Sequence, residues 1–163
     1  MAAAGRAEEV IAEMRRSTSD PMVAEALTTS MMRVAMAETC GKNGRLEEGL
    51  ELVAKGLQVA ERIGQRAMEA ELHRLKGELL MIKGTANRAK AEGCLRTAID
   101  VARREAARLF ELRTTVSLAR LLRDTNRRDE ARSKLAEIYN WFTEGFETAD
   151  LKEAKLLLDE LNR

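Results

Sequence analysis

The fold is decided by the stretch Gly77-Glu78-Leu79-Leu80, in which a small residue precedes a large apolar one by three positions. The same arrangement occurs earlier as Ala37-Glu38-Thr39-Cys40 and later as Ala119-Arg120-Leu121-Leu122. The three copies therefore begin at positions 37, 77 and 119, at nearly equal intervals. A period of about 40 residues indicates a repeated pair of helices.

A second set of positions follows the same period. Leu57, Ile99 and Tyr139 each follow one of the small residues at nearly the same distance, and only Ile99 lies slightly further along. An insertion of two residues near 85–90 accounts for every difference in spacing. Small residues let two helices approach closely, and large ones fill the groove between them. Two further sets keep this register: Gly49, Ala91 and Ala131, and Val53, Leu95 and Leu135.

Composition agrees with an all-α protein. The chain has 163 residues, of which 45% are hydrophobic, but it contains one proline and five aromatic residues, too few for a typical β-sandwich or barrel. Charges nearly cancel, with 28 Lys and Arg against 27 Asp and Glu, so the chain has no global basic field for nucleic acid. Helical periodicity predicts helices at 6–16, 21–41, 45–63, 66–83, 88–105, 107–124, 128–142 and 149–161.

The pattern resembles the tetratricopeptide repeat, although that unit is shorter, with about 34 residues. Two segments, Ala70–Leu80 (AELHRLKGELL) and Trp141–Lys155 (WFTEGFETADLKEAK), are similar to the C-terminal helical repeats of bacterial multidomain regulators with adenylate-cyclase-like or signalling ATPase domains. The resemblance implies a right-handed α-α superhelix, a solenoid of about eight antiparallel helices. The chain lacks a phosphate-binding Gly-x-x-x-x-Gly-Lys-Ser/Thr motif, so only a role in interaction carries over.

We expect one domain over residues 1–163. Its parts are an N-terminal half-repeat at 6–20, repeats at 21–63, 64–105 and 106–143, and a capping helix at 144–163. The half-repeat has an apolar face with Val10, Ile11 and Met14, which an upstream repeat would cover in a larger regulator and a second copy of the chain would cover in a homodimer.

The concave surface is the candidate binding site, because the first helices of tetratricopeptide-like pairs line it. Arg113, Arg120 and Arg123 share one helical face and predict a basic end, beside an acidic middle. Such a surface suits a peptide, a helix or a second copy that presents carboxylates to arginine side chains. The alternative is a solvated face with Glu–Arg pairs between adjacent helices. The candidate residues are Val34, Glu38, Glu71, Arg74, Glu78, Met81, Arg113, Val116, Arg120 and Arg123.

These features predict a non-enzymatic interaction or regulatory scaffold. The alternative is a small-effector sensor module of a bacterial signalling or transcription regulator. His73 is the only histidine and has no second ligand at helical spacing, so we predict no catalytic residue, metal or cofactor. Arg103-Arg104 and Arg127-Arg128 lie beside acidic residues and lack an aromatic platform, which argues against a nucleic-acid partner.

Compartment is predicted from apolar runs and cysteines. The longest purely apolar run, Leu79–Ile82, is far too short to span a membrane. Cys40 and Cys94 lie in apolar helical patterns and are predicted to be free buried thiols, which indicates a cytoplasmic protein without a membrane partner.

Two smaller predictions concern packing. Met31, Met32 and Met36 are expected to fill the core, although exposure on the inner helix would favour a binding role. The aromatic residues Tyr139, Trp141, Phe142 and Phe146 are expected to wedge the final helix onto the stack rather than to bind a cofactor. Asp150 and Glu153 are expected to form a capping box at its start.

Overall fold

The structure is a computed structural model that describes residues 21–63 and 68–163. Within those residues it contains helices and turns but no strand, so the prediction of an all-helical protein is confirmed. The predicted helix at 6–16, the half-repeat at 6–20 and the expected dimer contact lie outside the described residues. The elements are α2 (Pro21–Lys42), α3 (Leu46–Ile63), α4 (Glu69–Lys83), the short 3-10 helix η1 (Thr85–Asn87), α5 (Arg88–Arg104), α6 (Arg108–Arg123), α7 (Arg128–Tyr139) and α8 (Ala149–Leu161).

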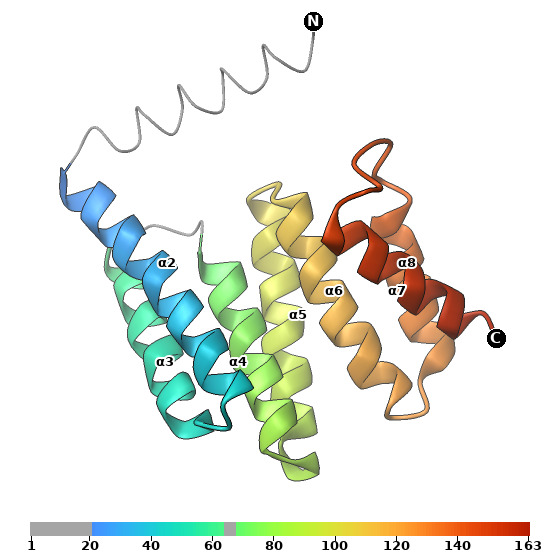
Figure 1. The fold of residues 1–163 in the computed structure, drawn as a ribbon, viewed down its shortest axis with the longest axis horizontal. Helices are drawn as coiled ribbons and strands as arrows, with labels where there is room; N and C mark the ends of the chain where they lie inside the picture. Colours follow the sequence, from blue (N-terminus) through green and yellow to red (C-terminus); the bar gives the residue numbers. More distant parts are fainter. Residues whose placement is uncertain (1–20, 64–67) are drawn as a thin grey trace, which may run out of the picture.

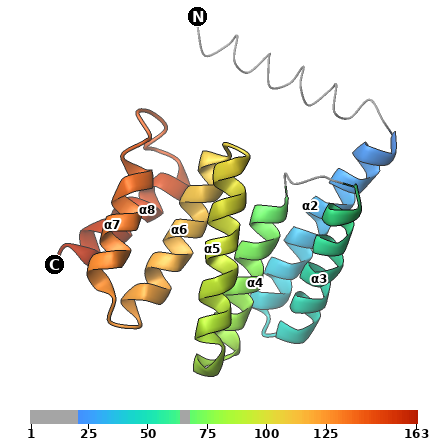
Figure 2. The ribbon, with the colours of Figure 1, turned by 180° about the vertical axis from the view of Figure 1, so that it is seen from behind.

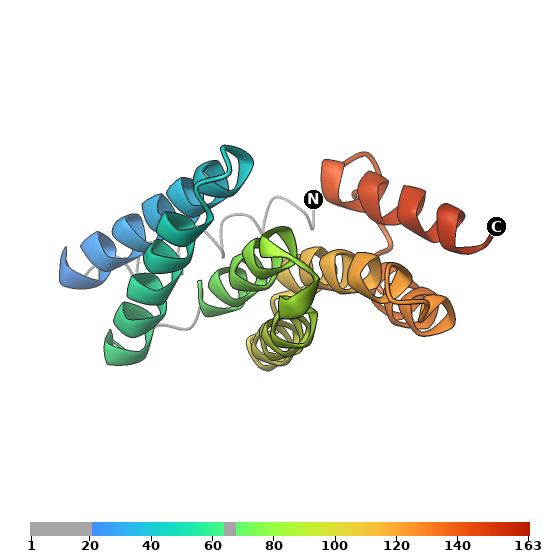
Figure 3. The ribbon, with the colours of Figure 1, turned by 90° about the horizontal axis from the view of Figure 1, so that it is seen from below.

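The helices form a curved double layer in chain order (Figure 1). Each α-helix packs against the next, and α2, α4, α6 and α8 also contact one another in succession. Seen from behind, α3, α5 and α7 lie on the near side (Figure 2). Seen from below, the helices follow an arc that has α2 and α8 at its two ends (Figure 3). The inner layer therefore brings together residues that are far apart in the sequence.

The turn inside each helix pair ends the first helix in a similar way. Gly44, Gly84 and Asn126 occupy equivalent positions, and all three have positive φ (73°, 137° and 61°), a conformation that favours glycine and asparagine. The residues after Gly44 and Asn126 donate backbone hydrogen bonds of 2.8 Å to the carbonyls of Cys40 and Leu122. The turn after Gly84 differs because η1 follows it, at the predicted position of the insertion.

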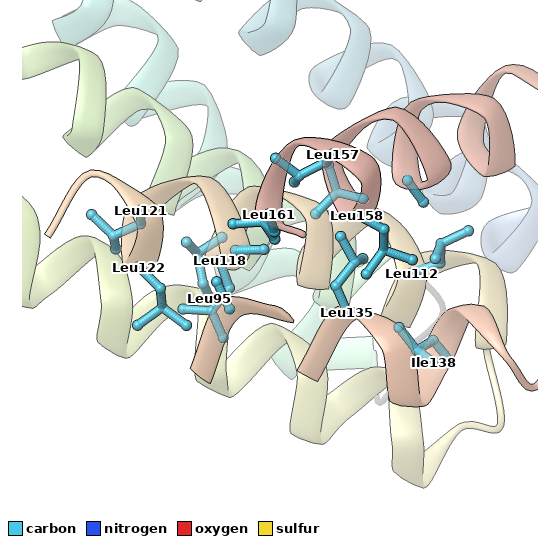
Figure 4. Close-up of a cluster of buried hydrophobic side chains, with 14 of the residues drawn as sticks. Leu95, Leu112, Leu118, Leu121, Leu122, Leu135, Ile138, Leu157, Leu158 and Leu161 are labelled. Carbon is cyan, nitrogen blue, oxygen red and sulfur yellow. The ribbon is translucent and has the colours of Figure 1, made fainter. Parts of the chain in front are cut away.

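The core consists of two large apolar clusters. One joins α2, α3 and α4 around Val53 and Leu72, and the other joins α5 to α8 around Leu95 and Leu135 (Figure 4). The sequence's matched small residues lie at helix contacts. A Cβ atom added to Gly77 would lie 2.8 Å from Cγ of Leu95, so this position has no space for a side chain. All nine positions of the repeat register are buried: Ala37, Gly77, Ala119, Gly49, Ala91, Ala131, Val53, Leu95 and Leu135.

Two predictions, one about α2 and one about α7, are wrong. Met31, Met32 and Met36 do not fill the core, since they are 60%, 59% and 49% exposed. Among the described side chains of α2, Ala37 and Cys40 are the buried apolar ones, and Val34 packs against the same core. The helix predicted to end at residue 142 ends at Tyr139. After it, the backbone N–H groups of Trp141 and Phe142 bond the carbonyl three residues earlier instead of four, which is a turn and not α-helix.

The aromatic residues lie where the last helix joins the stack. The rings of Tyr139 and Phe146 lie 5.8 Å apart, and those of Trp141 and Phe142 lie 5.2 Å apart in an edge-to-face arrangement. Tyr139 and Phe142 pack against the larger core cluster. Trp141 stays half exposed beneath the guanidinium group of Arg108. Tyr139 and Phe142 thus pack as the expected wedge beneath α8, whereas Trp141 and Phe146 remain exposed.

The outer helices α5 and α7 are bridged by a network of four charged residues. Arg127 donates hydrogen bonds of 2.8 and 2.9 Å to Glu92 and of 2.7 and 3.0 Å to Glu130, and Arg96 bonds both carboxylates as well. Burial acts to raise the pKa of Glu92 and of Glu130. The two guanidinium groups outweigh this effect and hold both pKa values below the usual 4.5.

Replacing Gly77 by alanine should destabilise the protein. Overpacking against Leu95 costs about 1–3 kcal/mol, more than the gain of about 1 kcal/mol from alanine's helix propensity. Gly93 is the matched control, because a Cβ atom there meets nothing within 4 Å and Gly93→Ala should raise the free energy of unfolding by about 0.5–1 kcal/mol. Urea unfolding measures both. Equal effects of the two substitutions would contradict the close approach at Gly77.

Stability should also fall in acid because of the outer network. Carboxyls with lowered pKa stabilise the folded state fully above their unfolded pKa, near 4.5, and lose this contribution as the pH falls through the folded pKa. The double variant Glu92→Gln/Glu130→Gln should therefore unfold with a shallower pH dependence below pH 4.5. Glu51→Gln/Glu144→Gln is the control, since neither residue forms an ion pair with another described residue. An unchanged pH dependence in the first variant would refute this role.

Candidate functional site

The inner helices meet at a hollow of about 350 Å³, the central hollow. Seven of the ten predicted site residues line it, contributed by α2, α4 and α6. The three lining residues that the sequence did not predict are Ser117 on α6 and two residues of α8. The full lining is Glu38, Glu71, Arg74, Glu78, Arg113, Val116, Ser117, Arg120, Asp150 and Glu153.

Arg74 is the most buried cation of this surface, with 8% of the residue exposed. Its guanidinium group donates to both oxygens of Glu71 at 2.6 and 2.9 Å, to Oε1 of Glu78 at 2.6 Å and to Oε1 of Glu38 at 3.1 Å. Ser117 also donates to Oε1 of Glu78, at 2.5 Å. One guanidinium group thus links α2 to α4, and Glu78 extends the link to α6.

The charge state of Arg74 follows from these contacts. Burial acts to lower the pKa of Arg74, but the hydrogen bond to Glu71 and the charges of Glu78 and Glu71 raise the pKa above its usual value. The guanidinium group therefore stays protonated at every physiological pH. Glu71 is 3% exposed and has both oxygens bonded to Arg74, so the two residues form a buried charge pair.

The predicted basic end is occupied by the chain itself. Arg113 forms a fork with both oxygens of Asp150, at 2.8 and 3.0 Å, and this contact raises the pKa of Arg113. Arg120 bonds Glu153 at 2.5 Å. The expectation that these arginines are free to receive a partner's carboxylates is therefore wrong. The alternative, Glu–Arg pairs between adjacent helices, describes this end of the surface.

Arg123 is paired as well. It bonds both Asp124 and Glu160, at 2.9 Å each. It lies outside the central hollow. The hydrogen bond to Asp124 acts to raise the pKa of Arg123, and the net pKa is above the usual value.

The predicted capping box at the start of α8 is also wrong. Thr148 is the residue before α8 and forms no side-chain cap. Asp150 and Glu153 lie on the side of α8 that faces α6, where charge-assisted bonds to arginine are stronger than a bond to a neutral backbone amide. Their acidic side chains therefore belong to the site.

Two of the three predicted apolar contacts are not brought into the central hollow. Val34 packs against the cluster of α2, α3 and α4, and Met81 packs against the cluster of α5 to α8. Val116 does line the central hollow, with 4% of the residue exposed. It is the one apolar residue among those that line it.

Two further hollows adjoin the central one. Between α2 and α4 lies a mainly apolar hollow of about 160 Å³, which shares Glu38 and Glu78 with the central hollow. Between α6 and α8 lies another, of about 400 Å³, which shares Arg120 and Glu153. Each of these two hollows shares residues with the central one, so the three lie next to one another along the inner helices, and we call them together the concave groove.

The repeat period contained a signal for one of the missed lining residues, Glu153, but not for Asp150, which lies one period after Phe110. Glu153 and Glu160 each lie one repeat period after an arginine of α6, Arg113 and Arg120 respectively. Continuing the repeat register into the last helix would have predicted acidic side chains in the positions that follow the arginines. Ser117 has no such signal, because small hydroxyl residues occur on every kind of helix face.

The remaining chemically reactive side chains lie away from the central hollow. Nε2 of His73 lies 3.9 Å from Glu69, and burial lowers the pKa of His73. Cys40 and Cys94 are free, and burial raises the pKa of the Cys94 thiol. Among the described residues, no group of three or more His, Cys, Asp or Glu side chains could hold a metal ion.

No protein-family model matches the sequence, and no curated protein matches it. The resemblance to regulators with tetratricopeptide-like repeats therefore stays a prediction. None of the helices described for residues 21–63 and 68–163 is long and apolar enough to cross a membrane.

Removing Arg74 should be far more damaging than removing an exposed arginine. Arg74→Met leaves the buried carboxylate of Glu71 without its partner, so the free energy of unfolding should fall by about 3–5 kcal/mol. Arg123→Met breaks an exposed pair with Glu160 and should cost less than about 1 kcal/mol. Denaturant unfolding compares them. Adding Glu71→Gln to Arg74→Met should restore part of the loss, and equal costs of the two single substitutions would refute the buried pair.

Proposed function

We propose that the protein is a non-enzymatic interaction domain whose concave groove holds a segment of a partner protein. The observation that carries this proposal is the row of three adjacent hollows along α2, α4, α6 and α8. A row of hollows with exposed side chains at both ends suits an extended peptide or a helix.

We further propose that the helix pairs form a right-handed, tetratricopeptide-like array. Support comes from the equivalent positions of the pairs. Ala37, Gly77 and Ala119 are buried, and the turn residues Gly44, Gly84 and Asn126 all have positive φ. In such an array the first helices line one face, which gives the partner a surface that spans several pairs. A role within a signalling or transcription regulator is what the resemblance implies.

The lining of the central hollow favours a peptide over a small effector. A volume of about 350 Å³ is within the range of small-molecule sites. Such sites, however, are lined mainly by apolar and aromatic side chains, whereas this one has eight charged residues, Val116 and Ser117. A charged, open lining suits a polar backbone and long side chains that remain partly hydrated.

Selection from a displayed library of random twelve-residue peptides tests the proposal, with the full chain as target. We expect enriched peptides whose affinity falls tenfold or more in Leu156→Asp, which places a charge at an exposed position of the groove. Leu109→Asp is the matched control, because Leu109 is exposed and lines none of the three hollows. The control should keep the affinity of the original chain.

Two outcomes would overturn the proposal. One is that no peptide is enriched, and the other is that every enriched peptide binds Leu156→Asp and the original chain equally well. A melting temperature that rises with a small metabolite and not with any peptide would favour the sensor alternative instead.

A further inference from the structure

We propose that the segment held in the concave groove is basic, with a lysine or arginine side chain in the central hollow and an apolar side chain at each end. This inference rests on the proposed function and names the chemistry of its partner. The proposed segment is basic, whereas the sequence analysis predicted a partner that presents carboxylates to the arginines. Three independent observations support it: the balance of charge, the unused carboxylate oxygens and the exposed apolar residues at the two ends.

The central hollow has an excess of negative charge. Five carboxylates line it, namely Glu38, Glu71, Glu78, Asp150 and Glu153, and three guanidinium groups, those of Arg74, Arg113 and Arg120. With all eight ionised, the lining has a formal charge of −2. A cationic side chain reduces this charge, whereas an anionic one increases it in a partly desolvated space where charges interact more strongly than in water.

The guanidinium groups are already engaged. Arg113 uses two nitrogens for the fork to Asp150, and Arg74 is surrounded by Glu38, Glu71 and Glu78. At Arg74 or Arg113 a partner carboxylate would compete with an internal carboxylate that is already bonded there, and the exchange would gain no net ion pair. Arg120 bonds Glu153 through Nη2 alone. The central hollow therefore attracts a basic side chain more strongly than an acidic one.

Several carboxylates, in contrast, keep an acceptor free. Oε1 of Glu38, Glu78 and Glu153 accepts the hydrogen bonds from Arg74, Ser117 and Arg120, whereas no described side chain bonds their Oε2 atoms. Glu38 and Glu153 are also partly exposed, at 41% and 48% of their side chains. These oxygens lie on α2, α4 and α8 around one hollow. They can accept from an ammonium or guanidinium group without breaking an existing bond.

Apolar side chains are exposed at both ends of the groove. Ile82 is 60% exposed in the hollow between α2 and α4, and Leu156 is 72% exposed in the hollow between α6 and α8. Val116 in the central hollow offers a contact for the methylene stem of a lysine or arginine. The pattern apolar, basic, apolar in the partner therefore matches the order of surfaces along the groove.

The length of the segment follows from helix packing. The outer two hollows are separated by two spacings between adjacent inner helices, or roughly 16–20 Å at the usual 8–10 Å per spacing. An extended chain covers this distance with about five or six residues. We therefore expect the basic residue to lie two or three positions from each apolar one.

The peptides enriched by selection on the full chain test the inference through their composition. We expect lysine or arginine with leucine, isoleucine, valine or phenylalanine two or three positions away on both sides. Replacing the basic residue of a synthetic selected peptide by glutamate should weaken binding at least tenfold in fluorescence polarisation. Binding should also weaken as salt rises from about 50 to about 300 mM.

Matched variants locate the contact. Glu38→Gln/Glu153→Gln should weaken the basic peptide at least fivefold, whereas Glu51→Gln, on α3 outside the groove, should leave its affinity unchanged. Leu156→Ala should weaken binding and Leu109→Ala should not. Circular dichroism and urea unfolding establish that each variant is folded before its affinity is compared.

The possible failures are distinguishable. If enriched peptides depend on Leu156 but are acidic or lack a basic residue, this inference is overturned and the proposed function stands. If basic peptides bind equally to the original chain and to Glu38→Gln/Glu153→Gln, their charge acts elsewhere and the inference is again overturned. If no peptide depends on the groove, the proposed function itself fails.

Discussion

The buried guanidinium group of Arg74 determines much of the character of the inner surface. A charge that is removed from water must be paired, because an unpaired one costs several kcal/mol. Arg74 satisfies this requirement with Glu71 on its own helix, Glu78 one turn further and Glu38 on α2. The same contacts hold α2 and α4 together and place three carboxylates around one hollow. The acidic lining is thus a consequence of burying a cation between helices.

Charges alternate along the inner layer at one position of the repeat. Glu71 on α4 corresponds to Arg113 on α6 and to Glu153 on α8, and each neighbouring pair of inner helices is joined by contacts of guanidinium groups or carboxylates. The ion pairs themselves form with residues at other positions, since Arg113 bonds Asp150 and Arg120 bonds Glu153. The carboxylates on the outside of these contacts keep acceptor atoms that bond no described side chain. The carboxylates that pair with the arginines inside the protein are therefore the same ones that make the surface of the central hollow acidic.

The all-helical fold could be predicted from sequence because its determinants are local. Small residues at Ala37, Gly77 and Ala119 indicate where helices touch, and glycine or asparagine indicates where they end. The site could be predicted only in part. Periodicity places Arg113 on the inner face, but it does not reveal that Asp150 lies opposite, since that contact depends on how α8 packs against α6.

The exposure of the methionines on α2 could not be predicted from the local sequence either. Met31, Met32 and Met36 satisfy the pattern of a core helix, yet α2 has a described helix on only part of its surface and leaves these side chains exposed. Similarly, Asp150 fits a capping motif by sequence, and a stronger contact with Arg113 overrides it. The methionines are decided by the surface of α2 that no described helix covers, and Asp150 by a partner distant in the sequence.

The most direct test of the account is a nuclear magnetic resonance titration of the labelled full chain with a synthetic basic peptide flanked by leucines. The account predicts that the shifted amide and methyl signals map to Glu38, Glu78, Val116 and Leu156, on the inner helices, and that Glu38→Gln/Glu153→Gln reduces the shifts. Signals that shift instead on the outer helices α3, α5 and α7, or around Trp141, would contradict the claim that the concave groove is the binding surface.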